Sequence, residues 1–116
     1  MWYYSEYTLD VKCSDNFPSE GKILLVQDVS KIADGKFSNM VNYHAETYRP
    51  VEWISTHQDM RGISLKYPTV LFILESKGGE INSHKKYYYK NGKIKEIKPI
   101  LMWPTDEEVE KMGWMG

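Results

Sequence analysis

The sequence contains only one cysteine, Cys13, among 116 residues. One thiol cannot form an internal disulfide and cannot supply the ligands of a cysteine-rich zinc site. The scarcity of cysteine favours a reducing compartment, because small secreted domains usually depend on disulfides. Cys13 follows a strand pattern on its apolar side, so we interpret it as a small buried residue and not as a nucleophile. We expect a cytoplasmic location.

Long apolar runs and an excess of one charge are also missing. The longest apolar runs, around Ile23–Val26 and Val70–Leu74, are far shorter than the roughly 20 residues that a membrane span needs. The first residues lack the basic start and apolar stretch of a signal peptide. Fifteen Lys and Arg residues against sixteen Asp and Glu residues give a formal net charge of −1. No overall field therefore attracts nucleic acid or a membrane surface, and we expect no membrane partner.

Motifs of known catalytic chemistry are absent as well. The sequence has no P-loop, no G-x-S-x-G nucleophile elbow and no dinucleotide-binding G-x-G-x-x-G. We therefore expect that the protein is not an enzyme and holds no cofactor. Hydrophobic residues make up 41% of the chain and charged residues 27%, which is typical of a globular domain. We predict one domain over residues 1–116, with a C-terminal extension from about residue 101.

The first half of the chain shows strand and helix patterns in turn. Residues 3–13 place apolar side chains at every second position, as a strand with one buried face does. An amphipathic helix follows, with Ser19 as its N-cap and Gly35 as a left-handed residue at its end. Residues 40–48 alternate again, and residues 51–55 predict a short further strand.

The second half predicts a helix, a central strand and a hairpin. Asp59 can cap a short helix, which stops before Pro68 because the residue before a proline disfavours the α region. The apolar run Val70–Leu74 predicts a central strand that is covered on both faces. Asn91-Gly92 is the strongest short-range signal for a hairpin, and it lies at the centre of residues 85–98.

Two helices among several strands in one short chain indicate an α+β fold. A single, mainly antiparallel sheet with both helices on one face is an economical arrangement, and we predict a ferredoxin-like architecture of this kind. In the tail, Trp103-Pro104 is followed by acidic residues typical of a first helical turn. We expect a short C-terminal helix there, or an extension that packs Trp103 back onto the domain.

The hairpin turn determines which side chains share a face. With Asn91-Gly92 as the turn, Lys90 lies opposite Lys93, while Tyr89 and Ile94 form the next pair and face the core. Like charges at paired positions destabilise a sheet, so sheet pairing does not explain the basic face. That face either protects an exposed edge from aggregation or binds phosphate or an acidic protein. The candidate binding face consists of Lys86, Tyr88, Lys90, Lys93 and Lys95, and we expect it to be exposed.

Several polar residues could in principle bind a metal. His44-x-Glu46 and His57-x-Asp59 each combine an imidazole with a carboxylate, and residues two apart on a strand point the same way. Asp10 lies on the first strand, where some ferredoxin-like metal-dependent ribonucleases carry an aspartate. Nothing in the sequence brings these groups together, so we predict no metal site.

One segment resembles a known family. Trp53-Ile54-Ser55-Thr56-His57 precedes Asp59-Met60 and Tyr67-Pro68, and an apolar strand and a hairpin closing on Asn91-Gly92-Lys93 follow. Over about residues 50–95 this order is similar to the ferredoxin-like domain of phage and plasmid accessory proteins related to YubB. The resemblance implies that fold and an origin on a mobile element. It implies no reaction and no catalytic residues.

The sequence leaves three functions open. We favour a small non-enzymatic binding protein of a phage or mobile element, which modulates or inhibits a host protein or nucleoprotein complex. An inhibitor of a bacterial defence system, such as an anti-CRISPR protein, is of this type and acts in the cytoplasm of the host cell. The second function is a nucleic-acid-binding module that uses the lysine face with Tyr88 as a stacking group. The third is a metal-dependent nuclease.

Overall fold

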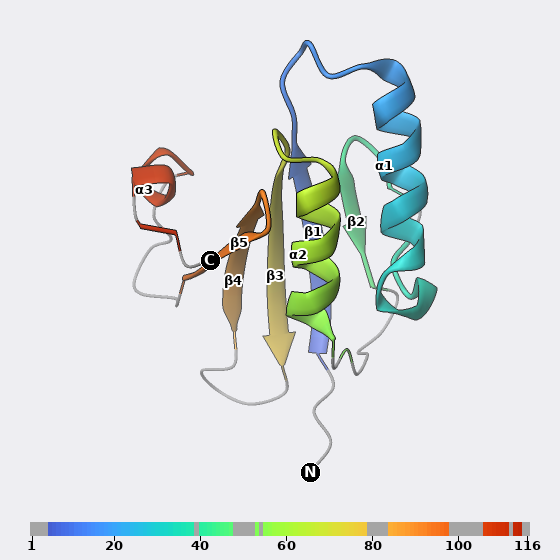
Figure 1. The fold of residues 1–116 in the computed structure, drawn as a ribbon. Coiled ribbons are helices and arrows are strands. Elements are labelled where there is room, and N and C mark those ends of the chain that lie inside the picture. Colours follow the sequence, from blue (N-terminus) through green and yellow to red (C-terminus); the bar gives the residue numbers. More distant parts are fainter. Residues whose placement is uncertain are drawn as a thin grey trace.

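Figure 1 shows the fold in a computed structural model, which describes residues 5–38, 40–47, 53, 55–78, 84–97, 106–111 and 113–114. The elements of these residues are β1 (Ser5–Lys12), α1 (Ser19–Lys31), the 3-10 helix η1 (Ala33–Gly35), β2 (His44–Glu46), α2 (Thr56–Lys66), β3 (Leu71–Gly78), β4 (Lys85–Lys90), β5 (Lys93–Ile97) and α3 (Asp106–Lys111).

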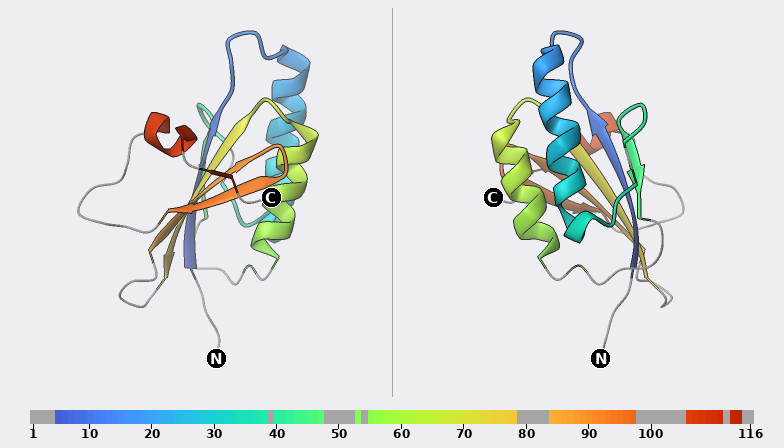
Figure 2. Two further views of the ribbon diagram at one scale, coloured as in Figure 1. Left: turned by 60° about the vertical axis from the view of Figure 1, so that its left-hand side comes forward. Right: turned by 90° about the vertical axis from the view of Figure 1, so that its right-hand side faces the viewer.

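The strands form one sheet in the order β2-β1-β3-β4-β5, and every neighbouring pair is antiparallel. Because β2 and β3 both run antiparallel to β1, they are parallel to each other, and α2 connects them across β1. α1 and α2 lie on one face of the sheet (Figure 2). The predicted α+β class is confirmed, and the arrangement is compatible with a ferredoxin-like fold.

The main core lies between these two helices and the sheet. β1 buries every second residue there, as its alternating pattern predicts. Cys13, directly after β1, is half-buried and packs against this core. The side chains that the core draws from the strands include Tyr7, Leu9, Val11, Phe72, Leu74 and Tyr89, and those from the helices include Leu25, Val29, Met60 and Ile63.

α3 lies on the opposite face of the sheet (Figure 2). A smaller core lies beneath it. Val109 of α3 is completely buried there. β3 is therefore covered on both faces, which confirms the central strand predicted from the run Val70–Leu74. The side chains that pack with Val109 are Leu71, Ile73, Tyr88 and Ile97.

The predicted helix is present as α1, but both of its ends differ slightly from the prediction. Its N-cap is Pro18, so the predicted cap at Ser19 is wrong by one residue. The backbone leaves helical geometry at Ile32, and Gly35, with a φ of 71°, ends η1 instead. Although the apolar stripe is broad, Ile23 and Leu24 remain 61% and 49% exposed.

α2 begins at Thr56, almost one turn before the predicted cap, Asp59. The prediction of Asp59 as a cap is wrong because its carboxylate has other partners. It accepts hydrogen bonds from Trp53 Nε1 at 2.7 Å and from Ser55 Oγ at 3.0 Å. The helix ends before Pro68, as predicted.

The strand predicted over residues 40–48 is shorter in the structure. Asn42 and Tyr43 have φ angles of 51° and 61°, so the backbone turns there and cannot continue a strand. Val41 and His44 exchange two backbone hydrogen bonds of 3.0 Å across this turn. β2 begins only after it.

Two predictions fall partly or wholly outside the described residues. Of the strand predicted over residues 51–55, only Trp53 and Ser55 are described, and neither is in a strand. Trp103 lies outside the described residues, so its packing stays a prediction. The short C-terminal helix is present as α3.

The hairpin has the predicted register. Asn91 and Gly92 have φ angles of 50° and 76°, and a type I′ turn requires positive φ at both positions. A Cβ on Gly92 would also lie 2.7 Å from the Leu65 side chain. Both stated pairs are present, Lys90 opposite Lys93 and Tyr89 opposite Ile94, and the same register continues to Lys86 opposite Ile97.

Replacing Tyr89 should show how much the main core depends on this register. Tyr89→Ala should lower the free energy of unfolding by about 3–5 kcal/mol, because it leaves a cavity where a completely buried ring was. Tyr89→Phe loses only the hydroxyl near His57 and should cost about 1 kcal/mol. Urea denaturation followed by circular dichroism measures both. Equal losses for the two variants would contradict the burial of the ring.

Candidate functional site

The centre of the candidate binding face of the hairpin is covered. Tyr88 is 1% exposed and Lys95 is 3% exposed, so the expectation that the whole face is accessible is wrong. α3 and Trp114 lie over its centre, with Lys95 Nζ 3.8 Å from the centroid of the Trp114 ring. Lys86 Nζ lies 5.7 Å from the centroid of the Tyr88 ring. The shared face forms as the register predicts, and the chain itself covers its centre.

Hydrogen bonds and charge hold α3 on this face. The Tyr88 hydroxyl donates to Asp106 Oδ1 at 2.8 Å, and the Lys12 ammonium pairs with the other oxygen of the same carboxylate. The Lys95 ammonium donates to the carbonyl oxygen of Val109. A helix rich in acidic residues therefore occupies the centre of the basic face.

Burial and these contacts shift the pKa values of the covered groups. Desolvation lowers the pKa of Lys95, although Glu110 opposes the shift. Desolvation also raises the pKa of the Tyr88 hydroxyl, and its bond to Asp106 adds to the shift. The hydrogen bond from Lys12 is the main cause of the lowered pKa of Asp106. Tyr88 thus remains a buried hydrogen-bond donor and offers no free ring for stacking on a base.

The end of the hairpin beside the turn remains accessible. Lys93 is exposed, and the half-buried Lys90 lies directly opposite it. Arg61 of α2 is exposed and donates from Nε to the carbonyl oxygen of Gly92 at 2.7 Å. None of these three cations has an ion-pair partner among the described residues. We call Lys90, Lys93 and Arg61 the basic tip.

Detaching α3 should uncover the basic face without unfolding the main core. Val109→Lys places an ammonium in an apolar cluster and near Lys95, so it should lower the free energy of unfolding by about 2–4 kcal/mol. Hydrogen exchange measured by mass spectrometry should show α3 unprotected while β3 stays protected. Glu107→Lys, at an exposed position of the same helix, is the control. Protected α3 amides in Val109→Lys would show that Val109 does not anchor the helix.

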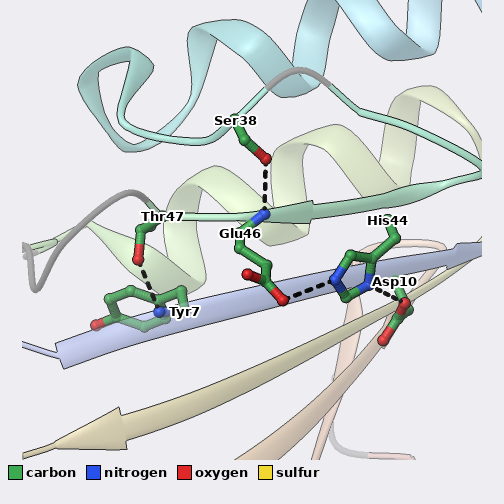
Figure 3. A network of polar contacts seen from close by, with 6 residues as sticks. All are labelled: Tyr7, Asp10, Ser38, His44, Glu46 and Thr47. Atoms are coloured by element: carbon green, nitrogen blue, oxygen red, sulfur yellow. Dashed lines mark hydrogen bonds and ion pairs between the residues drawn. The ribbon is translucent and has the colours of Figure 1, made fainter.

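Asp10, His44 and Glu46 form a polar network on β1 and β2, as Figure 3 shows. His44 Nδ1 lies 2.7 Å from Asp10 Oδ1, and His44 Nε2 lies 3.0 Å from Glu46 Oε1. The strand register places Asp10 opposite His44, with Glu46 two residues further on the same face. Sequence reasoning singled out all three residues, and the pairing of β1 with β2 brings them together.

The network leaves neither nitrogen of His44 free to bind a metal. Within the described ranges, no group of three or more His, Cys, Asp or Glu side chains could hold a metal ion. The second candidate pair does not join this network, because His57 lies near Tyr89 and Asp59 is bonded to Trp53. The hydrogen bond with Asp10 is the main cause that raises the pKa of His44, and the bond with Glu46 adds to it.

The raised pKa of His44 predicts a pH dependence of stability. Protonated His44 stabilises the fold below its unfolded pKa of about 6.5, and this contribution disappears as the pH rises through the higher folded pKa. His44→Gln should therefore lower the melting temperature more at about pH 5.5 than at about pH 8. Burial lowers the pKa of His57, so His57 affects stability in the opposite direction as the pH changes. Because His57 is present in both the wild-type protein and His44→Gln, its effect cancels in the comparison. The same loss at both pH values would contradict a charged network.

A pocket of about 300 Å³ lies between the start of α2 and the sheet. His57 Nδ1 lies 2.7 Å from the Tyr89 hydroxyl, and the His57 ring packs edge-on against Tyr87 with their centroids 4.8 Å apart. Burial raises the pKa of Tyr87 to about 12. His57 is the only one of the candidate metal ligands named in the sequence analysis that lines this pocket. Among the described residues, those that line the pocket are Tyr7, Ser55, Thr56, His57, Gln58, Ser76 and Tyr87.

Comparison with known proteins identifies no related protein. No family model, curated protein or solved structure matches this chain. None of the helices in the described residues is long and apolar enough to cross a membrane. The resemblance to the ferredoxin-like domain of YubB-related proteins thus rests on its sequence motifs alone.

Proposed function

We propose that this chain is a small non-enzymatic binding protein that uses the basic tip to bind an acidic surface. The supporting observation is the charge of the tip. Lys90 and Lys93 lie directly opposite each other, and Arg61 of α2 reaches the carbonyl oxygen of Gly92 in the same turn. Like charges at paired positions destabilise a sheet, whereas an anionic partner would neutralise all three.

Protection of a sheet edge does not account for the whole tip. Lys93 is on β5, which is the edge strand, and a lysine there does prevent edge-to-edge pairing. Lys90 is on β4, inside the sheet, and Arg61 is on a helix. These two cations therefore favour a partner over a protected edge.

The proposed partner is a host protein or nucleoprotein complex. The sequence resemblance to phage and plasmid accessory proteins supports a mobile-element origin, and inhibition of a bacterial defence system is the corresponding role. The covered Tyr88 gives no support to recognition of bases by stacking. Acidic side chains of a protein match the remaining cations better than a stacked nucleic acid does.

Charge reversal at the tip tests this proposal. Lys90→Glu combined with Lys93→Glu should leave the melting temperature nearly unchanged, because the two paired positions still carry like charges and neither lysine has an ion-pair partner among the described residues. The same variant should lose most of the partner that the wild-type protein retains in a pull-down from bacterial lysate, because attraction becomes repulsion. Lys36→Glu combined with Lys77→Glu reverses two exposed lysines outside the hairpin and should retain the partner.

Equal recovery of the partner by the wild-type protein and the tip variant would remove the basic tip from the function. Treating the lysate with nuclease separates the two partner classes. A protein partner survives this treatment. A loss of binding after the treatment, with a steep dependence on salt, would show that the tip contacts phosphates and that the protein-partner proposal is wrong.

A further inference from the structure

The first turn of α2 presents backbone donors that no side chain caps. Its N-cap residue is Ser55, whose hydroxyl donates to the Asp59 carboxylate and makes no capping bond. The N–H groups of Thr56, His57 and Gln58 have no carbonyl partner inside the helix, as in the first turn of any α-helix. The partial positive charge of the helix dipole is also at this end. All three residues line the pocket.

Ser76 of β3 is a second, independent donor in the same pocket. It is only 9% exposed, and its hydroxyl has no hydrogen-bond partner among the described residues. Among the described residues, every side-chain N or O atom that is completely inaccessible to solvent has a hydrogen-bond partner. The unpaired hydroxyl is therefore accessible, and Ser76 lines the pocket, where a ligand can reach it.

Aromatic rings provide an apolar wall beside these donors. Tyr7 pairs with Ser76 across β1 and β3, and Tyr87 comes from the neighbouring β4. Because His57 Nδ1 is engaged with the Tyr89 hydroxyl, the imidazole is held in place against the Tyr87 ring. A planar or apolar part of a ligand would pack against these rings.

The charges around the pocket are of both signs. The charged groups that act on His57 are Glu96, Lys85 and Arg61, and Glu96 has the largest effect of the three. The Glu96 carboxylate is paired with Lys85 at 3.3 Å, whereas Arg61 has no ion-pair partner among the described residues. Asp59 does not line the pocket, although its carboxylate accepts a hydrogen bond from Ser55, which does.

We propose that this pocket binds a small molecule that carries one carboxylate or phosphate group beside a ring or another apolar part. The first turn of α2 and the Ser76 hydroxyl hold the anionic oxygens, and Tyr7 and Tyr87 contact the apolar part. A volume of about 300 Å³ accommodates a single ring with one anionic substituent. The pocket lies on the helical face of the sheet, so this site does not depend on the basic tip.

An NMR titration tests the site with benzoate, phenyl phosphate, acetate and inorganic phosphate as probes. Benzoate or phenyl phosphate at millimolar concentration should shift the amide resonances of Thr56, His57 and Gln58. Acetate and inorganic phosphate should bind more weakly, because they lack the ring that packs against the tyrosines. Comparing benzoate with phenyl phosphate shows which of the two anionic groups the site prefers.

Two variants separate this site from nonspecific binding. Ser76→Ala removes an unpaired hydroxyl, so it should fold normally and weaken binding of the preferred probe about tenfold. Ser30→Ala removes an exposed hydroxyl from α1 and should leave the affinity unchanged. The charge-reversed variant at Lys90 and Lys93 should also bind the probe with wild-type affinity, even if that variant loses its macromolecular partner.

Three results would overturn the proposal. In the first, none of the probes shifts the three amides, and in the second, Ser76→Ala binds as tightly as the wild-type protein. In the third, the shifts are confined to Lys90 and Lys93, which would place the anion at the basic tip. None of these results contradicts a protein partner at the basic tip, so the two proposals can fail separately.

Discussion

The register of the β4–β5 hairpin is the constraint on which the rest of the structure depends. The Asn91-Gly92 turn sends Tyr89 to the main core and Tyr88 to the opposite face. A shift by one residue would exchange the two rings. Because each face of the hairpin carries a buried aromatic ring, another element must pack on each face and shield that ring from water. α2 packs against one, and α3 with its buried Val109 packs against the other.

Features set by local chemistry could be predicted from the sequence, and those set by distant segments could not. The alternation along β1 and the Asn91-Gly92 turn are local signals, and the structure confirms both. The burial of Tyr88 is not local, because its cover comes from α3, in which Val109 is the only buried residue. A single apolar residue among acidic ones gives no amphipathic pattern that would reveal a docking helix.

The same limit applies to the candidate sites. Asp10 and His44 both stand out as chemical groups, but α1 separates their strands, so no turn fixes how the strands pair. Ser76 gives no signal in the sequence at all. Its importance comes from the combination of burial, an unpaired hydroxyl and a position beside the first turn of α2. Such a pocket becomes visible only when β1, β3, β4 and α2 are assembled.

Although the net charge is only −1, acidic and basic side chains are concentrated on different elements. Acidic residues are concentrated on α3, and lysines on the β4–β5 hairpin. α3 places Asp106 between Tyr88 and Lys12, and Glu110 close enough to influence Lys95. An acidic helix of the chain thus neutralises the centre of the basic face, while the cations beside the turn have no ion-pair partner in the described part of the chain. This internal contact shows what the face accommodates: a carboxylate next to an apolar side chain. The basic tip offers other cations without such a cover, and it is therefore the place beside the hairpin turn at which an acidic partner can still gain charge contacts.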